Sequence, residues 1–482
     1  MLKKIALLLS AVIVILIAIV LVKTIQFSKP IPVKESLAIP ALPDSVVSHM
    51  QQAIHFKTVS FGTNLPIDSA AFKEFWQFVG KSYPLVTKSL TQQSFHEFSR
   101  VFKWEGKHPE LKPYVFMAHI DVVPIEKATE KQWTVPAFGG ILKNDQIYGR
   151  GAADDKACVI SILETVEKLL KQGFQPERTI YLSFGHDEEI GGPRGAGTIA
   201  NWFKENKIHP EVVIDEGGMI TKEHFPELKR PIALIGVTEK GYMSFLVSVQ
   251  LEGGHSSMPV PETAIDILCK GLVNLRKKQM PYKILPPLQE MLQRVGPGLS
   301  FVQRMAIANQ WLFEPILVKG LEKDKGTNAM LRTTIVPTIL QAGIKDNVIP
   351  GLATATVNTR ILPGQSIEEV EAFIKKQMND DRIVVKRTGP ASEDGPPVSI
   401  ESVAFKKVEA ATYQVMKDVI PTPFVMIGGT DSKYFQPIAD GVIKFTPGID
   451  PKGFHGVDER INKSDLARMM FFYELLMKDA GR

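Results

Sequence analysis

The stretch Tyr181–Gly192 constrains how this chain can fold. A β-forming run, Thr179–Phe184, is followed by three consecutive acids, Asp187, Glu188 and Glu189, and then by glycines. Neighbouring carboxylates at the end of a strand repel one another, so either solvent or a bound cation must offset the repulsion. The three acids alone leave two interpretations open: a solvated acidic turn, or a cation site with one carboxylate free to move a proton.

Three other potential metal-binding side chains follow short apolar runs that resemble buried strands. Between such runs lie helical patterns such as Lys156–Leu170, and this alternation predicts a mostly parallel sheet covered by helices. Sites in such sheets form at the carboxyl ends of the strands, so residues distant in sequence can converge there. The candidates are His119 after Tyr114–Ala118, Asp215 after Val212–Ile214, and His455 in the loop after Val442–Phe445.

A fifth candidate, Asp154, lies in the glycine-rich turn Gly149–Lys156, just before a helix. Considered alone, Asp154 fits the N-cap of that helix better than a metal ligand. The chain has two cysteines, Cys158 and Cys269, which we expect to be buried thiols, so neither a thiolate metal site nor a disulfide framework is available. The remaining set of two histidines and three carboxylates suits zinc, manganese or cobalt.

The length of 482 residues predicts more than one domain. At about Pro231 the pattern changes to longer, half-exposed strands such as Ala233–Val237, in a strand–helix–strand–strand–helix–strand order. We therefore expect an α/β fold, a mostly parallel sheet sandwiched by helices, with an inserted ferredoxin-like α+β lid or dimerisation domain. The expected ranges are 1–23 for a transmembrane anchor, 24–45 for a proline-containing linker, 46–235 and 389–482 for the two parts of the catalytic domain, and 236–388 for the lid.

The N-terminal run Ile5–Val22 is apolar and follows Lys3 and Lys4. It has the roughly 17–25 residues of a membrane-spanning helix, more than the roughly 7–15 residues in the apolar core of a signal peptide. No small-residue cleavage site follows, so we expect an uncleaved single-pass anchor and an extracytoplasmic catalytic domain, with a signal peptide as the alternative. The net charge of +5 is not gathered into basic and aromatic clusters, so nucleic-acid binding is not expected.

Together, these motifs resemble those of the di-zinc aminoacylase/carboxypeptidase metallopeptidase family. The resemblance runs from about residue 45 to the C-terminus and looks closest to the branch of carboxypeptidase S and the N-fatty-acyl-amino-acid hydrolases. The motifs that carry it are His119-Ile-Asp121, Gly149-Arg-Gly-Ala-Ala-Asp154-Asp-Lys156, Phe184-Gly-His-Asp-Glu-Glu189, Val213-Ile-Asp215-Glu-Gly-Gly218, Gly254-His-Ser-Ser-Met-Pro259 and His455.

The resemblance implies a centre of two zinc ions, for which cobalt or manganese can substitute. Glu188 would be the general base, and Asp121 would orient the imidazole of His119. The other implied ligands are Asp154 as the bridge, Asp215 completing the site of His119, and Glu189 with His455 forming the second site.

In the expected lid, the resemblance assigns His255 to support of the tetrahedral oxyanion, often across a dimer interface, so a homodimer is expected. Asn347 and Arg360 would hold the substrate, with the fork of Arg360 on its carboxylate. The loop containing Gly429 and Thr430 would bind a carboxylate through backbone N–H groups and a hydroxyl.

These assignments predict a metallohydrolase that cleaves a peptide or amide bond next to a free C-terminal carboxylate. Carboxypeptidase action on small peptides is the first candidate, and hydrolysis or synthesis of N-fatty-acyl amino acids is the alternative. A dipeptidase fits less well, because Arg360 and Gly429 favour a substrate carboxylate. A non-catalytic binding protein would be expected to have lost a ligand or Glu188. Residues 283–341, rich in apolar side chains, fit either extra packing of the lid or a wall for a large acyl group.

Overall fold

The computed structural model describes residues 1–29, 32–62, 65–223 and 227–480. Its larger sheet is mixed and mostly parallel, with strand order β1-β2-β6-β3-β7-β17-β9-β16 and with β8 paired to β9. Strands β6, β3, β7 and β17 are parallel neighbours, so their carboxyl ends meet at one edge. The strands are β1 Thr91–Phe95, β2 Ser99–Trp104, β3 Tyr114–His119, β6 Ile180–Gly185, β7 Val212–Asp215, β8 Ile220–Thr221, β9 Ile232–Glu239, β16 Ile420–Met426 and β17 Gly441–Lys444.

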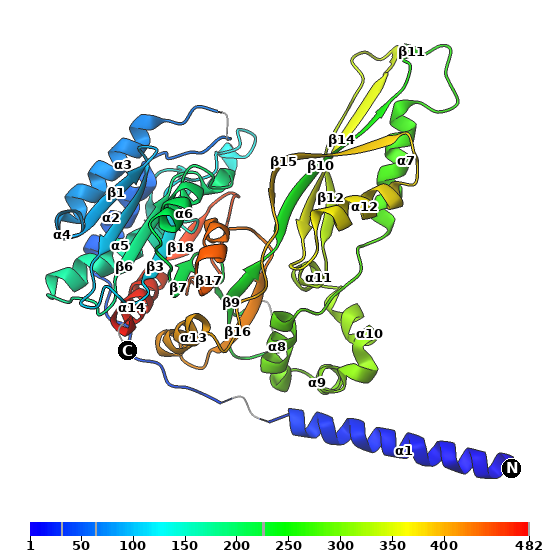
Figure 1. Cartoon of the computed structure of the whole chain (residues 1–482), viewed down its shortest axis with the longest axis horizontal. Helices are drawn as coiled ribbons and strands as arrows, with labels where there is room; N and C mark the ends of the chain where they lie inside the picture. Colours follow the sequence, from blue (N-terminus) through cyan, green and yellow to red (C-terminus); the bar gives the residue numbers. More distant parts are fainter. Residues whose placement is uncertain (30–31, 63–64, 224–226, 481–482) are drawn as a thin grey trace.

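Helices cover both faces of this sheet (Figure 1). On β3, Phe116 and Ala118 enter a core shared with α2, α3, α5, α13 and α14, whereas Val115 and Met117 enter a core shared with α6. A strand buried on both faces is an almost unbroken apolar run, as β3 is up to its last residue, His119. The expected α/β fold with a mostly parallel sheet is confirmed. The helices are α2 Asp44–His55, α3 Ser69–Ser82, α4 Pro84–Ser89, α5 Lys156–Lys171, α6 Ala196–Glu205, α13 Val403–Val415 and α14 Lys463–Asp479.

A second, antiparallel sheet has the strand order β12-β14-β10-β15, and α7 and α12 pack against it through a core of their own. We call this unit the lid. Figure 1 shows that its tip, at β11, points away from the larger sheet. Its elements are β10 Gly241–Gln250, β11 Gly254–His255, α7 Ala264–Lys277, β12 Thr334–Ala342, β13 Val348–Ile349, β14 Leu352–Ile361, α12 Ile367–Met378 and β15 Ile383–Ser392.

Two local expectations were wrong. The run Ala233–Val237 is not half-exposed, because it lies in β9, which is fully buried in the larger sheet beside β16. Helices cover both of its faces, so apolar residues on either side are packed. Cys158 is buried as expected, but Cys269 is exposed. It lies on the solvent face of α7, whose buried face includes Ile267 and Leu268.

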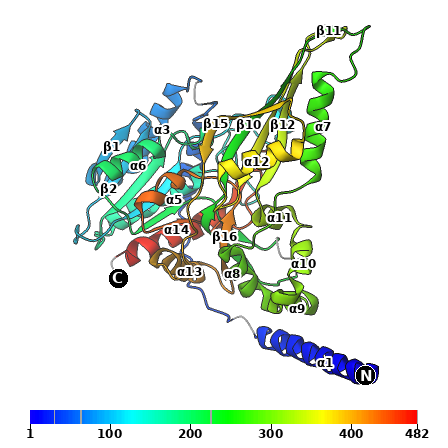
Figure 2. The ribbon, with the colours of Figure 1, turned by 45° about the vertical axis from the view of Figure 1, so that its right-hand side comes forward.

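Most of the apolar region 283–341 forms four helices that share a core with β9 and β16. They are α8 Pro286–Val295, α9 Phe301–Ala308, α10 Gln310–Leu321 and α11 Lys325–Leu331. Helix α8 packs on the edge strand β16, and α9 packs on α10 and on the N-terminal helix α1, Leu2–Phe27. Helix α1 is long and apolar enough to cross a membrane. Near its C-terminal end it runs beside α9, while its N-terminal part projects from the body (Figures 1 and 2).

Candidate active site

The predicted ligands gather at the carboxyl edge of the four parallel strands. His119 is the last residue of β3, and Asp215 is the last residue of β7. Glu188 and Glu189 begin a short 3-10 turn directly after β6, and His455 lies in the loop that follows β17. The alternation of strands and helices in the sequence is what brings these distant residues to one place.

Asp154 lies between the two histidines. Its Oδ1 is 3.0 Å from Nε2 of His119, and its Oδ2 is 3.0 Å from Nε2 of His455. The same nitrogen of His455 is 3.0 Å from Oε2 of Glu189. The alternative interpretation of Asp154 as a helix cap is therefore wrong, since the N-cap position of α5 belongs to Asp155. Each oxygen of Asp154 faces a different histidine, which is the geometry of a bridging ligand.

Two groups of ligand atoms lie close enough together to hold a cation each. Asp154, Glu189 and His455 form one group, and His119, Asp154 and Glu216 form the other, with the atoms of each group within 4.8 Å of one another. Asp154 belongs to both groups. Glu216 was not among the predicted ligands.

Asp215 is buried beside Glu216, but its carboxylate is engaged elsewhere. Its Oδ2 accepts a hydrogen bond from the backbone N–H of Ser432 at 2.9 Å, and its Oδ1 accepts one from the N–H of Glu216 at 3.0 Å. The structure thus brings Glu216, and not Asp215, next to His119 and Asp154. The two acids are adjacent, so a motif alone cannot say which of them faces the ligands.

Asp121 supports the turn that carries the two glutamates. Its carboxylate accepts hydrogen bonds from the backbone N–H groups of Glu188 at 3.1 Å and Glu189 at 3.2 Å. Nδ1 of His119 lies 3.0 Å from the carbonyl oxygen of Asp121 and 3.4 Å from its Oδ1. Asp121 is therefore placed to hold both the imidazole and the acids. Asp187 accepts hydrogen bonds from two backbone N–H groups later in the same loop, which gives it a structural role.

The site concentrates negative charge in a buried place. Burial raises the pKa of Glu188 and of Glu216, and neighbouring carboxylates raise both further, although His119 opposes the shift at Glu188. Hydrogen bonds with Asp154 and Glu189 raise the pKa of His455 to about 10. Without cations, protons would have to neutralise this excess of carboxylates. Metal ions remove the excess, and imidazole nitrogens with carboxylate oxygens are suitable ligands for zinc, manganese or cobalt.

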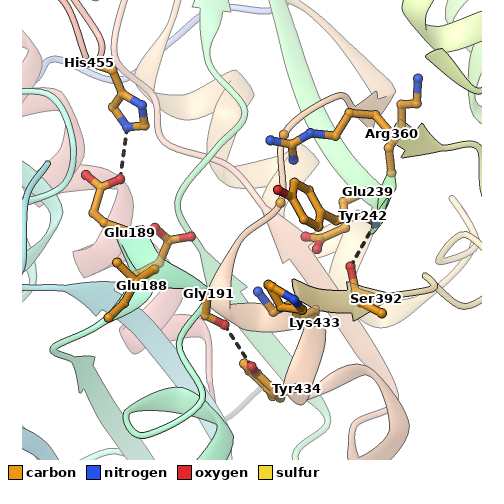
Figure 3. Close-up of a pocket in the computed structure, with 16 residues that line it drawn as sticks. Glu188, Glu189, Gly191, Glu239, Tyr242, Arg360, Ser392, Lys433, Tyr434 and His455 are labelled. Carbon is orange, nitrogen blue, oxygen red and sulfur yellow. Dashed lines mark hydrogen bonds and ion pairs between the residues drawn. The ribbon is translucent and has the colours of Figure 1, made fainter. Parts of the chain in front are cut away.

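A cavity of about 480 Å³ adjoins these ligands (Figure 3). Glu188, Glu189 and His455 line one side, and Arg360 and Tyr242 line it from the lid. The guanidinium of Arg360 lies over the ring of Tyr242, 4.9 Å from its centroid. The cavity therefore joins the acidic ligand set to a cationic group able to bind a carboxylate.

Comparison with known proteins agrees with this geometry. Residues 115–479 match peptidase family M20/M25/M40. The chain belongs to this family. The resemblance to the di-zinc aminoacylase/carboxypeptidase metallopeptidases is thereby confirmed, and the chain is an M20 hydrolase.

Relatives of this M20 hydrolase extend over nearly its whole length. It is 35% identical over 478 residues to the probable carboxypeptidase S-like 2 of Dictyostelium discoideum, covering 95% of this chain and 91% of that protein. It is 36% identical over 487 residues to the N-fatty-acyl-amino acid synthase/hydrolase PM20D1 of Xenopus tropicalis, covering 97% and 93%. The M20 family metallo-carboxypeptidase Sso-CP2 from Sulfolobus solfataricus shares the fold, with a TM-score of 0.66 at 17% identity and coverage of 91% and 100%.

The loop 428–433 of the M20 hydrolase contributes to the cavity in a way that the sequence did not fully predict. Gly429 lines the cavity, and so does Lys433, a basic residue that no motif had indicated and that joins Arg360 and Lys240 there. Thr430 is buried, and both its N–H and its hydroxyl lie 3.2 Å from Oε2 of Glu239. Thr430 thus contacts a carboxylate of the protein itself, while Gly429 remains open to a ligand.

His255 and Asn347 do not reach the cavity of their own chain. His255 is exposed on β11, at the tip of the lid, and its Nδ1 lies 2.7 Å from the hydroxyl of Ser257. Asn347 is exposed nearby, and its carbonyl accepts a hydrogen bond from the N–H of Ser256. Neither residue lines the cavity. Oxyanion support by His255 and substrate binding by Asn347 therefore stay predictions.

Glu459 holds the turn that contains Asp154, and the sequence reasoning missed it. Its buried carboxylate accepts hydrogen bonds from the backbone N–H groups of Gly151 at 3.0 Å, Ala153 at 2.8 Å and Asp154 at 3.0 Å. Arg150 donates a further bond of 2.6 Å. Burial raises the pKa of this carboxyl to about 6. Its position shortly after His455 in the sequence was the only available signal.

We expect Glu459→Gln to weaken metal binding by about 10–100-fold, the usual cost of losing a group that orients metal ligands. An amide keeps only one acceptor oxygen, so the turn can no longer hold Asp154 in place. A competition titration with a chelator measures the change. Glu167→Gln is the matched control, because Glu167 also accepts hydrogen bonds from two backbone N–H groups, those of Leu85 and Val86, away from the site. Equal metal affinity in both variants would contradict this role.

Proposed function

We propose that this M20 enzyme is a di-zinc hydrolase that cleaves a peptide or amide bond next to a free C-terminal carboxylate, as a carboxypeptidase would. One observation carries the proposal: Arg360 lines the same cavity as Glu188, Glu189 and His455. A substrate whose carboxylate binds the arginine fork would extend toward the acidic side of that cavity. The relatives named carboxypeptidase S-like support the same reaction class.

The residues of the chain divide the chemistry between them. Asp154 and His119 with Glu216 or Asp215 would hold one zinc, and Asp154 with Glu189 and His455 would hold the other. When bound, zinc supplies polarisation of the scissile carbonyl and a water of lowered pKa. Glu188 belongs to neither group, yet its Oε2 lies 4.0 Å from Nε2 of His119. It is thus placed to take a proton from the attacking water and to pass it to the leaving amine.

We expect Arg360→Lys to lower kcat/KM for a blocked dipeptide by about 10–100-fold, the effect of losing a charge-assisted hydrogen bond. A lysine keeps the charge but cannot bind both carboxylate oxygens at once. The same dipeptide with an amidated C-terminus should be a poor substrate for the unchanged enzyme and for Arg360→Lys. Its kcat/KM should be the same for these two proteins. Arg387→Lys, another lid arginine that is paired with Glu368 and Glu371 away from the cavity, is the control. An equal loss on both substrates would argue against a carboxylate contact.

A second candidate function is hydrolysis or synthesis of N-fatty-acyl amino acids, as the name of the PM20D1 relative says of that protein. A groove of about 810 Å³ whose lining is partly apolar favours it. The groove adjoins the segment in which the N–H of Val123 donates a hydrogen bond to Oε1 of Glu189 at 3.2 Å. An acyl chain lying there would leave the cavity at Arg360 to the amino-acid part. Lys57 and Glu130 also line the groove, and its large apolar side chains are Val59, Phe61, Ile125, Trp133, Val135 and Phe138.

A substrate pair tests the groove. We expect Phe61→Ala to lower kcat/KM for a long-chain N-acyl amino acid by about 10-fold, as expected for losing one aromatic contact with an alkyl chain. The N-acetyl derivative of the same amino acid should be unaffected. Phe61 is 56% exposed, so its replacement should leave the fold intact, which a melting curve can verify. If neither protein hydrolyses the long-chain substrate, the second candidate is wrong.

The proposal includes a single-pass anchor, an extracytoplasmic catalytic part and a homodimer. Burial of Thr24 of α1 in the folded body supports an uncleaved helix over a signal peptide. The lid has the strand order and element sequence of a ferredoxin-like unit. Its edge strand β12 exposes Val336, Ile339 and Leu340, a surface that suits a second lid. In such a dimer, the family resemblance implies that His255 would support the oxyanion in the site of the partner.

A further inference from the structure

Helix α10 is apolar on both of its faces. Leu317 and Val318 face the core beneath it, while the opposite face carries large apolar side chains and Pro315. Amphipathic helices at protein surfaces normally expose polar residues, and a helix that is apolar all round calls for an apolar environment on both sides. Helix α9 continues the surface. The exposed apolar side chains of the two helices, which we call the α9–α10 surface, are Phe301, Val302, Trp311, Leu312 and Ile316.

The last turns of α1 pack directly beside this surface. The buried amide nitrogen of Asn309, between α9 and α10, lies 3.1 Å from the hydroxyl of Thr24 and 3.2 Å from the carbonyl oxygen of Val20. The ring of Phe27 packs so closely on Gly296 that a Cβ there would lie 2.6 Å from it. These contacts fix the position of α9 and α10 along the axis of α1.

The level along α1 at which α9 and α10 pack is also the level at which the apolar run Ile5–Val22 ends. Lys23 is the first charged residue after Ile5–Val22, and its Nζ lies 5.5 Å from the ring centroid of Trp311. Lysine and tryptophan both favour the boundary between a bilayer and water. Val20, which contacts Asn309, lies about 4–5 Å of helix rise before Lys23. Helices that lie in the interface between bilayer and water bury their apolar faces by about 5–10 Å. The rise between Val20 and Lys23 is close to the lower end of that depth.

We infer that the α9–α10 surface inserts into the interfacial layer of a phospholipid bilayer, beside the point where α1 leaves it. The inference rests on the proposed anchor, and it adds a second membrane contact made by the folded body. A lipid occupant is favoured over a second copy of the chain, because the apolar residues that α1 exposes all round its first turns need the same medium. The surface lies beside α1, so the bilayer that surrounds α1 also reaches it.

Two membrane contacts, through α1 and through the α9–α10 surface, would hold the enzyme in a defined orientation on the bilayer. After α1 the chain continues in a segment without helix or strand, 32–43, which is itself held on the body by backbone hydrogen bonds between Leu37 and Gln414 and between Asp418 and Lys34. Helices α8–α11 share a core with β9 and β16 of the larger sheet. A surface inserted through α9 and α10 therefore fixes the height and tilt of the sheet above the lipid.

Spin labels on the full chain in nanodiscs of phosphatidylcholine and phosphatidylglycerol test the inference. In a Cys269→Ser background, single labels are placed at Val302→Cys and Ile316→Cys, at Ile13→Cys to report on the anchor, and at Ile344→Cys as a water-exposed control on the lid. Ile316 is 61% exposed and Ile344 is 96% exposed, so neither change disturbs a core. Collision with oxygen, which dissolves in lipid, is compared with collision with a nickel chelate, which stays in water. We expect the ratio of the oxygen collision rate to the nickel-chelate collision rate to be several-fold higher at 302 and 316 than at 344.

Each other outcome is decisive. Water-like ratios at 302 and 316 with a lipid-like ratio at 13 would overturn the inference and leave the anchor standing. Protection of 302 and 316 from both reagents would instead indicate a protein partner and would equally overturn it. A water-like ratio at 13 would refute the anchor, and lipid-like ratios at 302 and 316 would then support surface binding alone.

A second measurement, which needs no label on the protein, tests insertion of the α9–α10 surface. Lipids that carry a spin label near the headgroup quench tryptophan fluorescence at shallow depth. The chain has five tryptophans, and we expect Trp311→Phe to remove most of the quenchable emission. Trp202→Phe is the control, since Trp202 lies on α6 beside Phe95 and Phe203, away from α1. Equal quenching of both variants would contradict insertion of the α9–α10 surface.

Discussion

Glu188→Gln is expected to lower kcat by about 10²–10⁴-fold, the range typical for loss of a general base. The side chain lies close to the metal ligands, with Oε2 4.0 Å from Nε2 of His119, yet it belongs to neither ligand group. Glutamine has almost the same shape but cannot accept the proton of the attacking water. Steady-state kinetics on a blocked dipeptide measure the loss, and metal analysis should find the same metal content as in the unchanged protein.

The pH dependence of kcat/KM distinguishes a general-base role of Glu188 from a purely structural role. A general base must be deprotonated to act, so kcat/KM of the unchanged enzyme should rise with pH as its base loses a proton. Burial raises the pKa of Glu188, whereas cations bound beside it lower that pKa, so removal of metal should move this limb to higher pH. In Glu188→Gln the residual activity should lack that limb. A variant that keeps its metal and near-normal turnover would refute the assignment.

The part of the site that the sequence predicted is the part that depends on strand ends. His119 and Glu189 follow strands that are buried on both faces, and such strands are recognisable as short, uninterrupted apolar runs. Parallel neighbours then have to bring their carboxyl ends to one edge. The fold class follows from the same alternation of strands and helices. Periodicity is therefore enough to locate this edge of the sheet.

The remaining features depend on tertiary contacts that carry no local signal. Glu459 supports the turn of Asp154 across a gap of about 300 residues in sequence, and an isolated buried glutamate has no motif. Lys433 enters the cavity only because its loop turns toward the lid. The apolar residues of 283–341 fitted either extra packing or a wall for an acyl group, and none of them lines the cavity. Composition showed that these residues needed an apolar partner but could not identify β16 and α1 as that partner.

The choice between the adjacent acids Asp215 and Glu216 gives the second large effect. We expect Glu216→Gln to lose one metal ion per chain and most of its activity, because its carboxylate lies with the imidazole of His119 and the carboxylate of Asp154 in one ligand group. Asp215→Asn should keep its metal, since both oxygens of Asp215 already accept backbone hydrogen bonds, from Ser432 and from Glu216 itself. Metal content per chain, measured by mass spectrometry after dialysis against metal-free buffer, compares the two variants directly.

Stability provides the control that this comparison needs. Asparagine at 215 can still accept one hydrogen bond through its amide oxygen, but its NH₂ group faces a backbone donor, so we expect a loss of about 1–3 kcal/mol in unfolding free energy. Glu216→Gln removes a carboxylate whose pKa burial and its neighbours raise, so the protein without metal should become more stable. Asp215→Asn should therefore lose stability and keep its metal, whereas Glu216→Gln should gain stability without metal and lose a metal ion. Loss of metal in Asp215→Asn, with retention in Glu216→Gln, would instead favour Asp215 as the ligand that the family resemblance implied.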